Sequence, residues 1–247
     1  MTARFENRVA IVTGAASGIG RATALRLAHE GARVFAVDLY ADGLKELVAS
    51  AKGEIIALPG DITDPIMPTE IVERIGAPVD VLANVAGVMD SFLAAGEADD
   101  ETWERTMAVN LTAPFRLMRA VLPGMLATGS GAIVNVVSEA GLKGGCAGAA
   151  YTASKHGLVG LTKNTAFLYA PKGIRVNAVA PGPTMTGMRP DFRSVIAAER
   201  LPALIKASIS GLAQPEDMAA AITWLASPEA VNVNGIVLAS DNGWSAA

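Results

Sequence analysis

The chain has 247 residues, of which 51% are hydrophobic and 18% are charged, and its formal net charge is −4. This length is compatible with one α/β domain or with two small domains. Charges of both signs are scattered along the chain, so there is no basic stripe of the kind that predicts nucleic-acid binding. No apolar run reaches the roughly 18 residues that a membrane span requires. We therefore expect neither nucleic acid nor a membrane as a partner.

Cysteine and histidine are too rare to suggest a disulfide framework or a metal site. Cys146 is the single cysteine, which excludes an intrachain disulfide and a Cys-rich zinc site. The two histidines, His29 and His156, are far apart in the sequence, and no metal is expected. The N-terminal residues enter a strand-like run without the long apolar stretch of a signal peptide. Together these features favour a cytoplasmic protein.

Seven short runs rich in Val, Ile and Ala alternate with longer helical patterns. The predicted strands are residues 8–14, 32–38, 54–58, 79–85, 131–138, 174–180 and 235–240. They are almost continuously apolar, as is typical of parallel strands that are buried on both faces. Helices are predicted at residues 18–30, 41–51, 66–76, 100–127, 150–170, 191–207 and 215–226.

This repeated strand–helix order predicts an α/β fold: a single-domain, doubly wound sheet of about seven parallel strands with helices on both faces. No linker or repeat divides the chain, so residues 1–247 are expected to form one domain. In such folds the loops that leave the carboxyl ends of the strands build the ligand site. The Gly/Pro-rich segments 141–148 and 181–187 are candidates for these loops.

A glycine-rich turn, "TGAASGIG" at residues 13–20, follows the first predicted strand and opens the first predicted helix. Gly14, Gly18 and Gly20 let the backbone turn tightly, and a helix N-terminus offers amide donors to a pyrophosphate. The spacing is G-x-x-x-G-x-G, and by itself it is equally compatible with a tight strand–helix joint. Its position between a strand and a helix favours a Rossmann-type dinucleotide site.

Asp38 ends the second predicted strand, about 20 residues after the glycine turn. A carboxylate at this position can accept hydrogen bonds from both ribose hydroxyls of an adenosine, and it would repel the extra phosphate of NADP. Leu39 and Tyr40 follow it and supply no compensating cation. The alternative role is to cap the next helix. The position relative to the glycine turn favours the ribose role, and we expect NAD(H) as cofactor.

Further motifs follow in a fixed order: "GDITD" (60–64), "NVAG" (84–87), Asn110, Ser138, "YTASK" (151–155) and "IRVNAVAPGPTMT" (174–186). Over nearly its whole length the chain resembles the short-chain dehydrogenase/reductase family. It is similar to NAD-preferring members, and to 3-oxoacyl-acyl-carrier-protein reductase-like and sugar or alcohol dehydrogenases. Val85 departs from the second Asn that is usual in the N-N-A-G motif.

The resemblance implies that Asn110, Ser138, Tyr151 and Lys155 are catalytic. Residues four apart share a helix face, so Tyr151 and Lys155 can point into one cleft. An ammonium and an oxidised nicotinamide would favour the phenolate and let Tyr151 act as acid or base. Ser138 would stabilise the charge on the reacting oxygen, and Asn110 would hold a water that links Lys155 to solvent. Taken singly, Ser138 and Asn110 could merely cap local structure, and Lys155 could be a solvated surface residue.

The same resemblance implies further contacts with the cofactor. They are assigned to Ser17, Gly18 and Ile19 at the pyrophosphate; Asp61 and Ile62 at the adenine; Asn84 at the adenosine ribose; and Pro181, Gly182, Thr184 and Thr186 at the nicotinamide end. Residues 187–212 are expected to form a substrate lid with a mostly apolar surface. Cys146, in the loop between Ser138 and Tyr151, is interpreted as a small apolar wall of the substrate pocket, with a modifiable thiol as the alternative.

These features predict an NAD-dependent oxidoreductase that transfers a hydride between NAD(H) and a secondary alcohol or ketone. The family resemblance also implies a homotetramer. One alternative is a 3-oxoacyl-acyl-carrier-protein reductase, against which Asp38 argues because that reaction generally draws on NADPH. An alternative of another class is a non-catalytic, NAD-sensing module, for which loss of Tyr151 or Lys155 would be the expected mark.

Overall fold

The computed structural model describes residues 3–187, 191–208 and 211–246. Its centre is one seven-stranded sheet in the order β3-β2-β1-β4-β5-β6-β7, and every neighbouring pair is parallel. The strands are β1 (Val9–Thr13), β2 (Arg33–Asp38), β3 (Ile55–Pro59), β4 (Val81–Asn84), β5 (Gly131–Val136), β6 (Ile174–Pro181) and β7 (Val237–Ser240). This confirms the predicted doubly wound sheet, with strand ends shifted by one or two residues.

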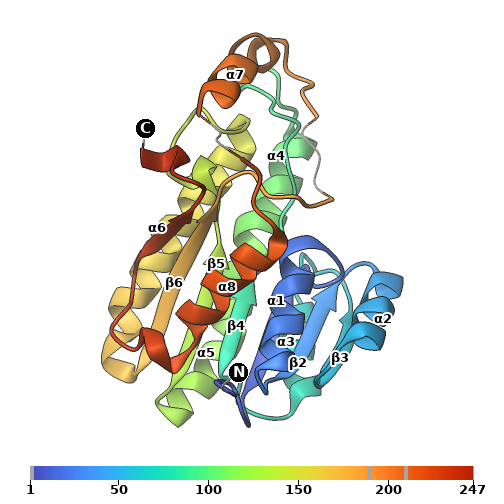
Figure 1. Cartoon of the computed structure of the whole chain (residues 1–247), viewed down its shortest axis with the longest axis vertical. Helices are drawn as coiled ribbons and strands as arrows, with labels where there is room; N and C mark the ends of the chain where they lie inside the picture. Colours follow the sequence, from blue (N-terminus) through green and yellow to red (C-terminus); the bar gives the residue numbers. More distant parts are fainter. Residues whose placement is uncertain (1–2, 188–190, 209–210, 247) are drawn as a thin grey trace.

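The strand order reverses between β1 and β4, which lie side by side in the middle of the sheet. The chain builds outward from β1 to β3 on one side and from β4 to β7 on the other (Figure 1). At such a switch point the loops leaving neighbouring strands diverge to opposite faces, which opens a crevice at the carboxyl ends. The predicted cofactor residues cluster in the loops of this edge.

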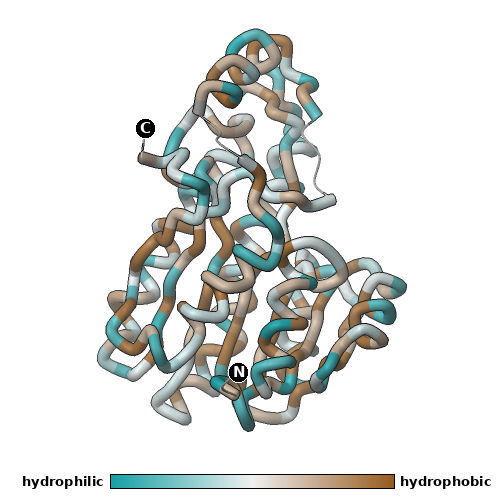
Figure 2. The backbone as a smooth tube through the Cα atoms, viewed as in Figure 1, coloured by the Kyte–Doolittle hydropathy of each residue, from teal (hydrophilic) through white to brown (hydrophobic). Residues whose placement is uncertain are grey.

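Helices cover both faces of the sheet. One core contains side chains of α1 (Gly18–His29), α2 (Ala41–Ser50) and α8 (Pro215–Ala226). The other contains side chains of α3 (Met67–Ile75), α5 (Ala113–Thr128) and α6 (Ala149–Tyr169). Because side chains alternate along a strand, Val12 enters the first core and Ile11 the second. The hydrophobic residues accordingly lie along the inner strands in Figure 2.

The predicted helix at residues 100–127 is interrupted, which the sequence interpretation missed. It consists of α4 (Asp100–Met107), a π-helical turn (Ala108–Thr112) and α5. Pro114 has no amide hydrogen to donate to the carbonyl of Asn110 four residues earlier, and the amide of Ala113 bonds instead to Ala108, five residues back. Such π-turns are frequent at functional sites. Here the turn places Asn110 in the protein interior, where it is fully buried.

Helix α7 (Val195–Ser208) starts four residues later than predicted. It lies beyond the end of the sheet, at the top of Figure 1. Short 3-10 turns complete the fold at Glu139–Gly141, Ala170–Lys172, Pro228–Ala230 and Trp244–Ala246. Among residues 3–187, 191–208 and 211–246, no helix is long and apolar enough to span a membrane.

Candidate active site

The glycine turn between β1 and α1 has the geometry of an anion cradle. Gly14 and Gly18 have φ of +67° and +49°, which L side chains rarely adopt. A Cβ on Gly20 would overlap the carbonyl oxygen of Gly14. Ser17 precedes α1 without a side-chain capping bond, and no acidic residue lies in the first turn. The amides and the positive end of the helix dipole therefore suit a pyrophosphate.

The segment after β6 closes over this turn. Gly182 packs so tightly that an added Cβ would lie 2.7 Å from Cα of Asp241. Thr184 donates a hydrogen bond to the carbonyl of Gly182 at 3.0 Å. A Cβ on Gly18 would lie 3.2 Å from the methyl carbon of Thr186. Residues far apart in the sequence, 14–20 and 181–186, thus meet at the carboxyl edge of the sheet.

Asp38 lies directly beside the glycine turn. Its carboxylate accepts hydrogen bonds from the amides of Ala16 (2.9 Å) and Tyr40 (3.0 Å). None of the ion pairs in the described part of the chain involves Asp38. The local bonds resemble a capping role, but they leave lone pairs on both oxygens for ribose hydroxyls. The position fits both interpretations made from the sequence.

Of the two residues predicted to contact the adenine, one lies at the surface near Asp38 and the other lies in the core. Gly60 donates its amide to the carbonyl of Asp38 at 2.9 Å, which places the following loop beside it. Asp61 is exposed, and its carboxylate accepts bonds from the amide and hydroxyl of Thr63. The side chain of Ile62 belongs instead to the core beneath the sheet. Asp61 therefore lies at the surface of this edge, and Ile62 supports it from below.

Asn84 ends β4 and is buried. It donates to the side-chain oxygen of Asn135 on β5 at 2.8 Å. Asn135 in turn donates to the Thr162 hydroxyl at 2.9 Å, so β4, β5 and α6 share a polar network. The side-chain oxygen of Asn84 has no partner within the described residues. A buried acceptor that the described residues leave without a partner is compatible with the ribose contact predicted for Asn84.

Tyr151 and Lys155 lie on the inward face of α6, with 8% and 2% of their surface exposed. The Lys155 ammonium lies over the Tyr151 ring, 5.4 Å from its centroid, and donates to the carbonyl of Val136 at 2.9 Å. Ser138, two residues after β5, faces the Tyr151 hydroxyl and lowers the pKa of Tyr151. The structure thus brings together three of the four predicted catalytic side chains.

Asn110 lies next to these three side chains, and its side chain holds the surrounding backbone through hydrogen bonds. Its side chain accepts from the Val88 amide (2.9 Å) and donates to the Val88 carbonyl (2.9 Å) and the Ser154 hydroxyl (3.2 Å). A Cβ on Gly87 would lie 3.3 Å from Oδ1 of Asn110 and 3.5 Å from Nζ of Lys155. Because both amide hydrogens of Asn110 are used, a relay water would be held by its backbone carbonyl, which Pro114 cannot satisfy.

Burial controls the ionisation of the central pair. Burial raises the pKa of Tyr151 to about 12; the Ser138 hydroxyl opposes the rise, and the negative charge of Asp90 adds to it. Burial lowers the pKa of Lys155 to about 8. The phenol is therefore neutral at neutral pH, ready to donate a proton. Tyr151, Lys155 and Ser138 by themselves do not produce the lowered tyrosine pKa expected from the sequence, which also invoked the charge of the oxidised nicotinamide.

A second titratable group next to Ser138 was not anticipated. Glu139 is fully buried, and neither carboxylate oxygen has a partner with hydrogen-bond geometry among the described residues. Burial, with the nearby carboxylate of Asp241, raises the pKa of Glu139 to about 7. Cys146 is half-buried, and burial, with the charge of Glu139, raises the pKa of its thiol to about 11. An undissociated thiol agrees with the role of an apolar wall.

The predicted lid, residues 187–212, is described only in part, because 188–190 and 209–210 lie outside the described residues. A Cβ on Gly145 would lie 3.4 Å from Leu204 on α7, which puts this helix over the loop that carries Cys146. Val195, Ile196 and Leu204 are 68%, 55% and 48% exposed. Such exposed apolar side chains are typical of a surface that covers a ligand.

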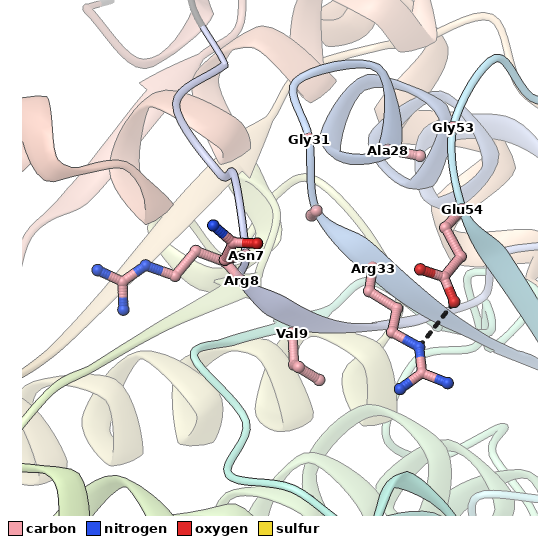
Figure 3. A pocket seen from close by; sticks show the side chains of 9 residues that line it. Asn7, Arg8, Val9, Ala28, Gly31, Arg33, Gly53 and Glu54 are labelled. Carbon is pink, nitrogen blue, oxygen red and sulfur yellow. Dashed lines mark hydrogen bonds and ion pairs between the residues drawn. The ribbon is translucent and has the colours of Figure 1, made fainter.

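Two surface hollows occur at the opposite, amino edge of the sheet. One has a volume of about 400 Å³ and lies among Arg8, Arg33 and Glu54 (Figure 3). The other, of about 500 Å³, lies among Arg4, Asp80 and Arg175. Neither contains a predicted site residue, so the candidate site rests on convergent side chains at the carboxyl edge. In the described part of the chain, no cluster of three His, Cys, Asp or Glu side chains could hold a metal.

Comparison with known proteins identifies the family of the chain. Residues 8–196 match the family model described as short chain dehydrogenase. The short-chain dehydrogenase/reductase olcF of Penicillium canescens is 41% identical over 253 residues, covering 98% of both chains. The chain belongs to the short-chain dehydrogenase/reductase family. It is an oxidoreductase of that family, whose members use an NAD(P) cofactor.

Two solved structures show how similar the whole chain is to family members. A Beutenbergia cavernae structure, named as an NAD(P)-dependent gluconate 5-dehydrogenase with NADP at low occupancy, has a TM-score of 0.89 and 39% identity, covering 100% of both chains. A Brucella melitensis 3-oxoacyl-acyl-carrier-protein reductase with bound NAD has a TM-score of 0.86 and 30% identity, covering 98% of this chain and 92% of that one. The two neighbours thus differ in the cofactor they bind.

Proposed function

We propose that this protein transfers a hydride between NAD(H) and a secondary alcohol or ketone, with Tyr151 as the general acid and base. One observation carries the proposal: Tyr151, Lys155 and Ser138 converge at the carboxyl edge of the sheet, beside the glycine turn. A bound nicotinamide would supply the hydride acceptor or donor. The chain's own residues would move the proton and hold the reacting oxygen.

Each side chain has a defined task in ketone reduction. The neutral Tyr151 phenol donates its proton to the carbonyl oxygen, and Ser138 donates a hydrogen bond to the same oxygen as negative charge develops there. Lys155, held by Val136, offers its remaining hydrogens to ribose hydroxyls and its charge to a phenolate. Alcohol oxidation runs the same proton path in reverse, and the phenolate then needs the added positive charge of the oxidised cofactor.

The cofactor preference rests on Asp38. Its carboxylate lies 2.9 Å from the Ala16 amide, inside the predicted cofactor crevice, where a 2′-phosphate would bring two like charges together. This argument supports NAD(H) over NADP(H) for this chain, although the gluconate dehydrogenase neighbour holds NADP.

A panel of secondary alcohols and ketones, followed through the absorbance of reduced nicotinamide, tests the activity. We expect turnover with NAD(H), and for Tyr151→Phe a loss of roughly 10²- to 10⁴-fold, the usual contribution of a general acid, with NADH binding retained. Full activity of Tyr151→Phe would refute the mechanism. If neither cofactor supports any turnover, the non-catalytic NAD-sensing module becomes the better description.

A second candidate, a 3-oxoacyl-acyl-carrier-protein reductase, is favoured by the likeness to the Brucella melitensis enzyme. An acetoacetyl thioester belongs in the same panel. A kcat/KM for this thioester well above that for every simple ketone would favour the second candidate.

A further inference from the structure

The loop between β4 and α4 contains a backbone conformation that needs explanation. Ser91 and Phe92 have φ of 54° and 57°, consecutive left-handed residues that are not glycine. A left-handed conformation is unfavourable for such residues and persists only where surrounding contacts impose it. In Asp90–Glu97, which we call the bridge segment, those contacts occur on two sides.

The inner contact fixes the start of the catalytic helix. Asp90 is fully buried, and its carboxylate accepts from the amides of Tyr151 (2.8 Å) and Phe92 (3.1 Å). The amide of Ala149 donates to the carbonyl of Leu93 at 2.8 Å. A Cβ on Gly148 would lie 2.5 Å from the Asp90 carboxylate, so glycine is required for this approach. The first turn of α6, including Tyr151, is anchored on the bridge segment.

The outer contact fixes the start of α7. The Ser194 hydroxyl and the amides of Val195 and Ile196 face the Glu97 carboxylate, and they lower the pKa of Glu97, the Ser194 hydroxyl most. A carboxylate on the first amides of a helix is a favourable capping arrangement. Glu97 also accepts from the Ala94 amide at 3.1 Å, which ties this cap back into the bridge segment.

Two more contacts join the same partners. The Phe92 ring stacks on Phe192, with centroids 4.2 Å apart and planes at 24°. The amide of Arg193 donates to the carbonyl of Ser91 at 3.1 Å. The two strained residues thus hold the segment that leads into α7, while Asp90 immediately before them holds Tyr151. Movement of α7 cannot leave this strained turn unchanged.

We propose that the bridge segment couples the seating of helix α7 to the position of Tyr151, with Asp90 as a positioning residue; this rests on the proposed acid–base role of Tyr151. Seating α7 through Glu97 and Phe92 stabilises the strained turn. The strained turn in turn holds the Asp90 carboxylate against the first turn of α6. A substrate that closes α7 would thereby bring the Tyr151 phenol into position for proton transfer. Contacts between substrate and α7 would then increase the rate of the reaction as well as substrate binding.

The electrostatic role of Asp90 gives this proposal a distinct signature. The groups that face Tyr151 are Asp90 from the bridge segment, Ser138 after β5 and Lys155 on its own helix. The negative charge of Asp90 raises the pKa of Tyr151. An Asp90→Asn variant should therefore ionise Tyr151 at lower pH, while its amide group presents a donor to backbone donors and loosens the turn.

Hydrogen–deuterium exchange of the full-length protein tests the coupling without a substrate, and so independently of the proposed function. Glu97→Gln removes the negative charge that faces the first amides of α7, which weakens this cap, and touches no predicted catalytic residue. We expect faster exchange in peptides covering 191–208 and, at least threefold, in peptides covering 149–155. Glu216→Gln, which removes a carboxylate from the first turn of α8, is the matched control and should change neither. Faster exchange confined to 191–208 would overturn the coupling.

Kinetics then test the consequence for catalysis. Glu97→Gln should lower kcat by about tenfold as well as raise KM, because a small misplacement of a reacting group is costly. An effect on KM alone would mean that α7 only holds the substrate. Asp90→Asn should lower kcat and move the acidic limb of the alcohol-oxidation pH profile to lower pH. A pH profile that does not move in Asp90→Asn would contradict the role of Asp90. If the wild type itself shows no turnover, the proposed function is refuted instead.

Discussion

The exposed ion pairs at the amino edge of the sheet differ from the buried charges at its carboxyl edge in what they cost the fold. At the amino edge, Arg8 pairs with Asp80 at 2.7 Å and Arg33 with Glu54 at 2.8 Å, all with substantial exposure. At the carboxyl edge, Lys155 and Glu139 are almost completely buried. Neither takes part in an ion pair among the described residues. Paired, exposed charges cost the fold little, but buried, unpaired ones oppose folding and need another reason to be there.

That reason is chemistry. A buried group whose pKa departs strongly from its ordinary value is a candidate functional group when it faces a crevice. Lys155 and Tyr151 satisfy this condition beside the glycine turn, whereas the charged side chains in the hollow of Figure 3, Arg8, Arg33 and Glu54, are exposed. The comparison predicts that substitutions at the carboxyl edge separate activity from stability, and that substitutions at the amino edge affect neither strongly.

The largest effect is expected for Lys155→Met. Activity should fall roughly 10³-fold, within the range for loss of acid–base support. Burial lowers the pKa of Lys155 to about 8, so the charged form of Lys155 destabilises the folded protein below pH 8. This destabilisation decreases as the pH rises from about 8 towards the ordinary lysine pKa of about 10.4. At pH 7 we expect the free energy of unfolding to rise by about 1–2 kcal/mol. Chemical denaturation measures this, and a clear destabilisation at pH 7 would contradict it.

Glu139→Gln should change stability in a pH-dependent way. The pKa of Glu139 is raised to about 7, so the wild type loses stability as pH increases from about 4.5 to 7, where the unfolded chain is ionised at Glu139 and the folded chain is still neutral there. Gln stays neutral, and its amide can donate to Asp241. The variant should match the wild type near pH 4 and exceed it by up to about 3 kcal/mol at pH 8. Thermal melts across this range measure the effect. The expectation is wrong if the Tm values of the variant and the wild type differ by the same amount at every pH.

Asp38→Ser should alter the cofactor preference rather than the fold. The wild type is expected to bind NADH at least tenfold more tightly than NADPH, about 1.4 kcal/mol. Removing the carboxylate removes repulsion of the 2′-phosphate and also the hydrogen bonds to the ribose, so the two affinities should converge. Fluorescence titration with both reduced cofactors measures this. Tighter NADPH binding by the wild type would reverse the assignment of Asp38.

Much of the fold could be predicted from the sequence because its signals are local. Buried parallel strands are continuous apolar runs, and the confirmed sheet follows from their alternation with helices. The Tyr151–Lys155 pair was readable from the i,i+4 spacing. The π-turn at Asn110 was missed, although Pro114, four residues later, was the available signal.

The remaining features depend on contacts between distant segments. Nothing next to Asp90 in the sequence shows that it binds the amide of Tyr151, 61 residues later. Glu139 meets Asp241 only because β5 and β7 end at the same edge of the sheet. Burial, which sets the pKa of Tyr151, is likewise a property of the packed structure. Motifs therefore identify the reacting groups, but their pKa values also depend on burial and on residues such as Asp90 that no motif contains.

The smallest effect is expected at the amino edge, for Arg33 and Glu54. Their side chains are 47% and 59% exposed and lie 2.8 Å apart. Arg33 also lies over the ring of Phe35, 5.1 Å from its centroid. A double-mutant cycle with Arg33→Met and Glu54→Gln should give a coupling free energy below about 1 kcal/mol, decreasing with added salt. Activity should be unchanged in both variants, because the ion pair lies at the opposite edge from Tyr151. A loss of activity comparable to that of Lys155→Met would mean that charge at this edge also serves the reaction, and the contrast between the two edges would fail.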